Sequence, residues 1–300
     1  MPKTTIIGSG LSGMVGSRFA EMFASDFDFI NLDLTNHIDI TNPVQIDQAL
    51  SQQSSTSVIH LAAFTDVSKA YSETGNKNGM VYKVNVLGTE NIANACKKYH
   101  HYLIHISTDF VFDGKNPPPV GGYTEEDQPH PIEWYGQTKL WAEQKVVNSG
   151  CQHVNCRLAF PFRAKFPAKE DLVRKILAKL KTNILHSMFA DQIITPTFID
   201  DICQALKIFI EKKPSGIYHV VGSTSLTPYD LALKIAAVFD IKADIKLGSF
   251  KDFLKTDPRP RQQFLRISNT KLKKDFGIEM KTIDEALEIL KIQLNHTPGV

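Results

Sequence analysis

Cysteine is scarce in this chain, with four residues among 300. They stand at positions 96, 151, 156 and 203, too few and too scattered for the disulfide framework of a small secreted domain. The chain runs from Met1 almost directly into the apolar Thr4–Ile7 and then a series of glycines, so no secretory leader is expected. We therefore expect reduced thiols and a cytoplasmic protein.

An excess of one charge and long apolar runs are also missing. Lysine and arginine number 34 against 32 acidic residues, a net charge of +2, which leaves no electrostatic footprint for nucleic acid. No apolar run approaches the roughly 18 residues of a membrane span. Neither nucleic acid nor membrane is expected as a partner, and the composition is that of an ordinary globular protein.

Short apolar runs alternate with amphipathic stretches through the first half of the chain, which predicts βαβ units around a parallel sheet. We predict a Rossmann-type, doubly wound α/β domain over residues 1–157, with returning segments from roughly 197–222. Residues 158–300 are predicted to form mainly a smaller, irregular α/β substrate domain. The strands expected are Thr4–Gly8, Phe27–Leu32, Ser57–Leu61, Tyr102–Ser107, His153–Leu158 and Gly216–Val221.

Glycines gather at the end of the first predicted strand. The segment Gly8–Gly16 fits G-x-G-x-x-G from Gly8 or G-x-x-G-x-x-G from Gly10. In such a turn the missing side chains let a pyrophosphate reach backbone N–H groups at a helix N-terminus. Asp33 ends the second predicted strand, about twenty residues on, where a carboxylate binds the adenosine ribose. Its charge would repel a 2′-phosphate and favours NADH over NADPH, whereas Arg18 could reach such a phosphate.

A tyrosine and a lysine lie four residues apart in the predicted helix Trp134–Asn148. This spacing places Tyr135 and Lys139 on one helix face. An ammonium about 4 Å from a phenol would lower the phenol's pKa by roughly three units at an effective dielectric constant of about 20. The sequence therefore predicts a general acid at Tyr135. Thr108 follows the predicted strand Tyr102–Ser107 at its carboxyl end, where it could hydrogen-bond the same substrate oxygen.

Together these motifs resemble those of an extended short-chain dehydrogenase/reductase. Further segments narrow the resemblance to the dTDP-4-dehydrorhamnose reductase family. They are His60–Ala63, Val84–Asn91, Ser107–Gly114, Asp191–Thr197, Gly216–His219 and Arg259–Arg261. The resemblance extends over nearly the whole chain.

The resemblance implies an NAD(P)H-dependent oxidoreductase of dTDP-rhamnose biosynthesis. Its substrate would be a nucleotide-linked deoxysugar with a C4 keto group, dTDP-4-dehydro-L-rhamnose, which becomes dTDP-L-rhamnose. Tyr135 would donate the proton, Lys139 would lower the Tyr135 pKa and hold the nicotinamide ribose, and Thr108 would orient the keto oxygen. Asp109 and Phe160 would contact the sugar. The remaining cofactor contacts implied are Gly10, Gly13, Met14, Val15, Gly16, Asp33, Asp39, Ile40, Ala62, Ala63 and Asn85.

Some features depart from the family pattern or leave alternatives open. Phe160 stands where the family usually has tryptophan, and Gln263 where it has serine. Some members use magnesium, but the sequence contains no carboxylate cluster that supports it, so no metal is predicted. Dimers are common in the family, and a homodimer is expected. The alternatives are a nucleotide-sugar 4-epimerase or dehydratase, and a non-catalytic regulatory subunit of the methionine adenosyltransferase β type.

Overall fold

A computed structural model describes residues 3–54, 56–115, 121–185 and 187–295. The chain forms two compact units, each built from separate segments. The first contains Met1–Asp113, Gln128–Arg157 and Cys203–Tyr218, and the second contains Gly114–Asp127, Leu158–Ile202 and His219–Val300. The predicted boundary therefore needs correction at residues 114–127, which belong to the second unit. The cause is pairing with a segment far along the chain, since the Gly114 carbonyl accepts hydrogen bonds from the backbone N–H groups of Gln263 and Phe264.

The first unit is built around a six-stranded sheet with the order β2-β1-β3-β4-β5-β9. Strand β1 runs parallel to β2 and β3, and β3 runs parallel to β4. The order reverses at β1, and in open α/β sheets ligands bind beyond the carboxyl ends of the strands at such a switch point. The strands are β1 Thr4–Ser9, β2 Phe27–Asn31, β3 Ser57–His60, β4 Tyr102–Thr108, β5 His153–Leu158 and β9 Gly216–His219.

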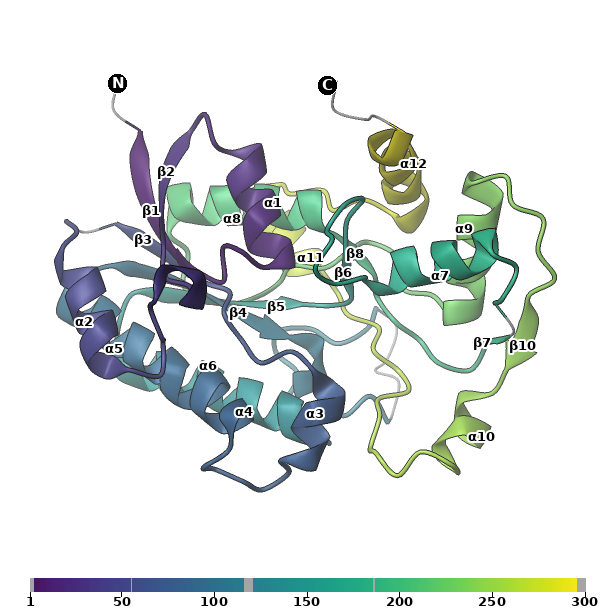
Figure 1. The fold of residues 1–300 in the computed structure, drawn as a ribbon, viewed down its shortest axis with the longest axis horizontal. Coiled ribbons are helices and arrows are strands. Elements are labelled where there is room, and N and C mark those ends of the chain that lie inside the picture. Colours follow the sequence, from purple (N-terminus) through teal and green to yellow (C-terminus); the bar gives the residue numbers. More distant parts are fainter. Residues whose placement is uncertain (1–2, 55, 116–120, 186, 296–300) are drawn as a thin grey trace. The chain divides into compact units, whose positions relative to one another are not determined.

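Helices cover both faces of this sheet, as the predicted doubly wound fold requires. Helices α1 and α8 lie on one side, and α2, α5 and α6 lie on the other (Figure 1). Strand β3 is buried along its whole length, which is typical of a central parallel strand. The helices are α1 Met14–Met22, α2 Pro43–Ser51, α3 Val67–Ser72, α4 Met80–Tyr82, α5 Thr89–Lys98, α6 Trp134–Ser149 and α8 Ile199–Lys212.

Helix α2 begins at a local sequence signal. Asn42 caps α2 by accepting hydrogen bonds from the N–H groups of Val44 and Gln45, and Pro43 occupies the first helical position. Helix α5 is preceded by a π-helical segment, η2 Lys83–Gly88, which leads directly into it. Two short 3₁₀ turns complete the unit, η1 Leu34–Asn36 and η3 Asp109–Val111.

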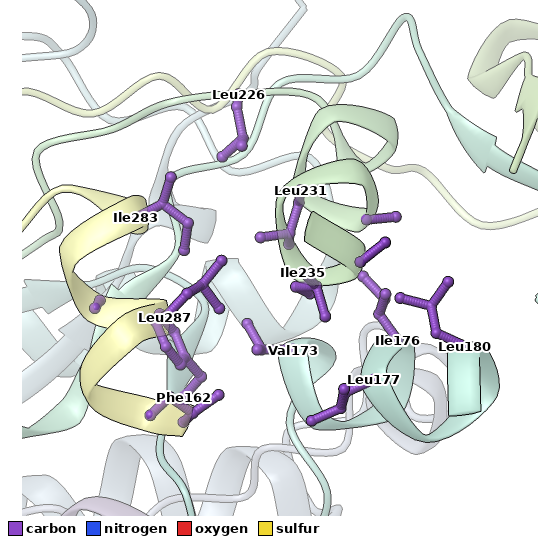
Figure 2. Close-up of a cluster of buried hydrophobic side chains, with 14 of the residues drawn as sticks. Phe162, Val173, Ile176, Leu177, Leu180, Leu226, Leu231, Ile235, Ile283 and Leu287 are labelled. Carbon is purple, nitrogen blue, oxygen red and sulfur yellow. The ribbon is translucent and has the colours of Figure 1, made fainter. Parts of the chain in front are cut away.

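The second unit has its own apolar core. Figure 2 shows side chains of α7, α9 and α12 pointing toward one another, among them Val173, Ile235 and Leu287, each at most 1% exposed. Two small parallel sheets, β6-β8 and β10-β7, complete the unit. Its elements are β6 Pro161–Phe162, α7 Leu172–Lys181, β7 Ser187–Phe189, β8 Thr197–Phe198, α9 Pro228–Val238, β10 Lys246–Gly248, α10 Phe250–Leu254, α11 Thr270–Phe276 and α12 Ile283–Asn295. Among the described residues, no helix is both long and apolar enough to cross a membrane.

Candidate active site

The glycine-rich turn between β1 and α1 is a tightly packed backbone loop. Gly10 has a φ of +78°, and a Cβ atom there would lie 2.6 Å from the backbone nitrogen of Ala62. A Cβ at Gly16 would collide with the carbonyl oxygen of Gly10. Gly10 belongs to both spacings considered, and a Cβ at Gly8 would lie 2.5 Å from the Leu11 side chain, so glycines of both spacings need the missing side chain. Gly13 is the N-cap of α1 and has no side chain to cap it.

Asp33 is buried where β2 ends, and it binds the glycine loop itself. Its two carboxylate oxygens accept hydrogen bonds from the backbone N–H groups of Gly10 and Ser12, the latter at 2.8 Å. The carboxylate therefore fixes the loop against the end of β2. The predicted contact of Asp33 with an adenosine ribose stays a prediction.

Three other predicted cofactor positions also make contacts within the protein. Asp39 accepts hydrogen bonds from the N–H and hydroxyl groups of Thr41, both at 2.8 Å. Ile40 is buried, and its side chain packs so closely on Gly88 that a Cβ there would lie 2.8 Å from the Ile40 side chain. The Asn85 amide accepts a hydrogen bond from the Phe64 N–H and donates one to the Thr138 hydroxyl. Asn85 thus joins the chain after β3 to α6. Ala62 and Ala63 lie in that same stretch, half-buried.

The three predicted catalytic residues lie in the first unit, on β4 and α6. Thr108 ends β4, and the interaction of its hydroxyl with the Tyr135 phenol lowers the pKa of Tyr135, against the larger effect of burial. The same hydroxyl donates to Asp109 Oδ1 at 3.0 Å. Lys139 is 2% exposed and its ammonium donates to the Ile106 carbonyl oxygen of β4 at 2.7 Å. The structure therefore brings Thr108 and the Tyr135 phenol together, and it fixes Lys139 to the same strand, β4.

The electrostatics around Tyr135 differ from the prediction. Burial, and then the carboxyl groups of Glu133 and Asp109, raise the pKa of Tyr135, the opposite of the net lowering predicted from the sequence. A contribution of Lys139 that opposes this rise stays a prediction. Burial also lowers the pKa of Lys139 to about 8, partly offset by Glu143. Burial favours the neutral form of both groups, and the carboxyl groups of Glu133 and Asp109 further oppose ionisation of the phenol. Tyr135 is consequently a protonated phenol at neutral pH.

Glu133 lies at this site and was not identified by the sequence analysis. It is the N-cap of α6, 8% exposed, and accepts hydrogen bonds from the N–H groups of Tyr135 at 3.0 Å and Gly136 at 2.6 Å. Its position just before the predicted helix was a usable signal, although glutamate is not a common N-cap residue. Burial raises the pKa of Glu133 to about 7.

Two buried histidines lie beside the same strands. His60 of β3 contacts the hydroxyls of Ser9 and Thr89 at 2.6 and 2.9 Å, and its ring lies 5.4 Å from that of His105 on β4. Burial and the charge of Lys139 lower the pKa of both rings, that of His60 to about 3. They are therefore neutral, in accordance with a structural role. The cysteine and histidine segment around residues 151–156 also holds no metal-binding cluster within the described part of the chain.

The two departures from the family pattern lie in the second unit. Phe160 has a φ of +40°, a conformation rare for a residue with a Cβ, and its carbonyl accepts a hydrogen bond from the Thr197 N–H at 3.2 Å. Gln263 donates from its side-chain amide to the Asp191 carbonyl oxygen at 2.6 Å. Gln263 thus supports the Asp191 turn, whose carboxylate in turn accepts hydrogen bonds from the start of α10.

Fold and site together define a class of protein. The strand order, the glycine turn after β1 and the Thr108–Tyr135–Lys139 set are those of a Rossmann-type oxidoreductase of the extended short-chain dehydrogenase/reductase kind. More narrowly, the chain belongs to the RmlD substrate binding domain family, whose family model matches residues 4–294.

Individual relatives agree with this assignment. The dTDP-4-dehydrorhamnose reductase of Aggregatibacter actinomycetemcomitans is 28% identical over 305 residues, covering 97% of this chain and 99% of that protein. A crystal structure of dTDP-4-dehydrorhamnose reductase from Bacillus anthracis in complex with NADP has a TM-score of 0.86 at 28% identity, covering 97% of this chain and all of that one. Methionine adenosyltransferase 2 subunit beta of Rattus norvegicus is 32% identical, but over only 53% of this chain and 48% of that protein.

Proposed function

We propose that this protein reduces the C4 keto group of a nucleotide-linked deoxysugar, dTDP-4-dehydro-L-rhamnose, to give dTDP-L-rhamnose. The observation that carries the proposal is the contact of Thr108 with Tyr135 next to the buried Lys139. It occurs in a chain that matches a reductase of that name over nearly its full length. A regulatory subunit or an epimerase has no specific observation in its favour.

The residues present fit a nicotinamide dinucleotide. Gly10 and Gly16 leave the turn after β1 without side chains, and the uncapped start of α1 favours an anionic group. Gly13, Met14 and Val15 would bind the pyrophosphate, while Asp39 and Ile40 would lie toward the adenosine end. The bound nicotinamide supplies the hydride that reaches C4.

Tyr135 supplies the proton that balances this hydride. The phenol O–H bond breaks as the C4 oxygen gains its proton, and the Thr108 hydroxyl orients the same oxygen by hydrogen bonding. Lys139, held by the Ile106 carbonyl, places a positive charge near the phenolate that the transfer leaves behind. Asp109 and Phe160 are proposed sugar contacts.

The decisive experiment follows oxidation of NADH and NADPH with dTDP-4-dehydro-L-rhamnose generated in situ. We expect turnover by the wild-type protein and a loss of roughly 100-fold or more in Tyr135→Phe, because general acid catalysis contributes on the order of 10²–10⁴. Tyr99→Phe, at the end of α5, is the matched control and should keep full activity. Absence of turnover with bound cofactor would reject the rhamnose assignment. Tight cofactor without net consumption would instead support an epimerase.

Cofactor preference forms a separate part of the proposal. The buried charge of Asp33 favours NADH, whereas the Bacillus anthracis relative was crystallised with NADP. Arg18, the basic residue suggested as a phosphate contact, lies 3.3 Å from Glu21. We propose that NADH is preferred, and the ratio of the kcat/KM values for NADH and NADPH decides it.

The expected homodimer stays a prediction. The four buried free thiols support the cytoplasm as the proposed compartment.

A further inference from the structure

We propose that the side of β4 and β5 that faces α6 is an internal water-binding site, formed by His105 and Asn155 beside Lys139. Neither His105 nor Asn155 has a part in the proposed function. Their ligand is water, which connects two strands of the sheet and gives the Lys139 ammonium a further hydrogen-bond acceptor. The effect on Lys139 rests on the proposed reductase function, whereas the water site itself does not.

A row of buried polar side chains crosses three neighbouring strands of the sheet. The register pairs His60 of β3 with His105 of β4. On the other side of β4, the Leu103 N–H donates to the Gln152 carbonyl oxygen at 2.9 Å, which in a parallel sheet places Asn155 of β5 beside His105. The three side chains in the row are each at most 1% exposed.

All three side chains of the row point to the face of the sheet that α5 and α6 cover. The His60 ring contacts a hydroxyl of α5 and lies 5.4 Å from the His105 ring. Asn155 lies two residues before Arg157, whose guanidinium pairs with Glu143 of α6, and alternate residues of a strand share one face. The row therefore lies in the buried layer between the sheet and these two helices.

The two histidines of the row differ in how their ring nitrogens are satisfied. His60 uses both nitrogens, since Nδ1 contacts the Ser9 hydroxyl at 2.6 Å and Nε2 contacts the Thr89 hydroxyl at 2.9 Å. Within the described ranges of the chain, His105 has no hydrogen-bond partner at either ring nitrogen, and Asn155 has none at either amide atom. Burial of four polar atoms without partners is costly, so a bound molecule is expected to supply them.

Water fits these four atoms better than an ion does. A neutral imidazole and a primary amide each present both donors and acceptors, and water satisfies both kinds whereas an ion satisfies one. The spacing also fits, because neighbouring strands lie about 4.8 Å apart and a water about 2.8 Å from each of two groups spans a similar gap. An amide flip at Asn155 exchanges its donor and acceptor without supplying a partner. A bridging water therefore satisfies His105 and Asn155 together.

The Lys139 ammonium lies beside this pair of residues. It donates to the carbonyl oxygen of Ile106, the residue that follows His105 in β4, at 2.7 Å. The charge of Lys139 acts on the rings of both His60 and His105, which agrees with this placement. An ammonium has three N–H donors, so the bond to Ile106 leaves donors for a cofactor ribose and for a water. The water thus restrains the ammonium on which the proposed mechanism depends.

A double-mutant cycle in urea unfolding tests the shared water. Asn155→Leu or His105→Leu alone displaces the water and leaves the other side chain without a partner, so each single change should lower the urea midpoint. The double variant removes both polar groups and should recover much of that loss. Without a shared water, each single change removes an unsatisfied group, so each midpoint should rise and the two effects should add. That result would overturn the inference.

His101→Leu, combined with Asn155→Leu, is the matched control. His101 is also a buried histidine, 1% exposed, but both of its ring nitrogens have protein partners, the Thr56 N–H at 3.1 Å and the Leu50 carbonyl oxygen at 3.0 Å. It lies four residues before His105, about 13 Å away along the strand direction. Its effect on the urea midpoint should therefore add to that of Asn155→Leu.

A crystal structure at a resolution that shows internal water is the second measurement, and it decides the matter if the variants do not fold. We expect a water within about 3.2 Å of polar atoms of both His105 and Asn155. A direct hydrogen bond between the two side chains, or an ion in place of the water, would overturn the inference.

The effect on Lys139 is measured in the double variant, which keeps the fold and loses the water. We expect its kcat/KM for NADH to fall by about tenfold, the loss of one hydrogen bond to a charged group. His105→Gln, which keeps a donor and an acceptor for water, should retain most of the activity. An unchanged kcat/KM in the double variant would overturn the role assigned to Lys139. A wild-type protein without turnover would reject the proposed function, and the unfolding cycle would still decide the water site.

Discussion

At the residue scale, the site depends on groups whose ordinary chemistry is changed by burial. Lys139, Glu133 and Asp109 are buried and Tyr135 is half-buried, within two segments, the end of β4 and the start of α6. Burial favours the neutral form of each, and hydrogen bonds and charges then adjust the balance. The glycine turn, by contrast, can form only because Gly10 and Gly16 have no side-chain atoms.

Gly10→Ala should disable the loop. The change adds a Cβ 2.6 Å from the Ala62 nitrogen and forces an L-residue into a φ of +78°. The left-handed conformation alone costs about 1–2 kcal/mol, and the collision adds to that cost. Gly75→Ala is the matched control, because Gly75 has a φ of +81° and nothing within 4 Å. Urea unfolding and NADH titration should show a larger loss for Gly10→Ala. Equal losses would mean that conformation, and not close approach, is what Gly10 provides.

Asp109→Asn should reveal how stability depends on the Asp109 proton. The folded-state pKa of Asp109 is raised to about 7, so the folded protein binds more protons than the unfolded chain between about pH 4 and 7. The Asp109 contribution to the free energy of unfolding therefore falls as pH rises through that window, by at most about 4 kcal/mol at roughly 1.4 kcal/mol per unit. Asparagine does not titrate, so the variant should gain stability relative to wild type between pH 5 and 8 in urea unfolding. A constant difference would contradict the raised pKa.

At the element scale, a buried ion pair between Arg157 and Glu143 holds α6 to strand β5 of the sheet. Arg157 of β5 donates to both oxygens of Glu143 on α6, at 2.9 and 2.7 Å, and its guanidinium lies 5.1 Å from the centre of the Phe112 ring. The two side chains are 1% and 5% exposed. Such a pair fixes the orientation of the helix that carries Tyr135 and Lys139.

Removing one partner of this ion pair should lower the free energy of unfolding more than replacing both partners with apolar residues. Glu143→Leu leaves the Arg157 charge buried and should lower the free energy of unfolding by about 3–5 kcal/mol. The double change Glu143→Leu with Arg157→Met should recover much of that loss, because no unpaired charge remains. Denaturant unfolding of the single and double variants measures both. A double variant as unstable as the single one would show that packing, and not charge, dominates the site.

Elements could be predicted from the sequence where a signal is local. The apolar runs located all six strands of the sheet to within about two residues. The π-helical start at Lys83–Gly88 was not predictable, because its form depends on tertiary packing. The same holds for Glu133, whose burial requires η3 to pack on α6, and for Asp33, whose partners lie across the glycine loop.

At the scale of the whole molecule, the chain forms two units, and each unit is made of three separate chain segments. The first unit carries the glycine turn and the Thr108–Tyr135–Lys139 set, and the second has a separate apolar core around α7, α9 and α12. This division supports the predicted assignment of cofactor to one part and sugar nucleotide mainly to the other, which binding measurements can examine.

Hydrogen exchange should assign the two ligands to their units. NADH alone should protect the backbone of the turn around Gly10–Gly16 and the stretch after β3, because these would contact the dinucleotide. A dTDP ligand alone should protect segments within 158–202 or 219–295 and leave the glycine turn unchanged. Protection of the glycine turn by dTDP alone would contradict the assignment of the two ligands to different units.

The interrupted first unit also constrains the order in which the protein can be completed during synthesis. Its sheet ends with β9, and the Tyr102 hydroxyl donates to the Pro214 carbonyl oxygen, so residues past 200 finish a unit begun at β1. A ribosome must therefore make all of the second unit's middle segment, Leu158–Ile202, before the first unit can close. A chain cut after residue 157 would present β5 as an open sheet edge, the kind of edge that invites aggregation. Dissection of this protein into independent halves should accordingly retain residues 203–218 with the amino-terminal part.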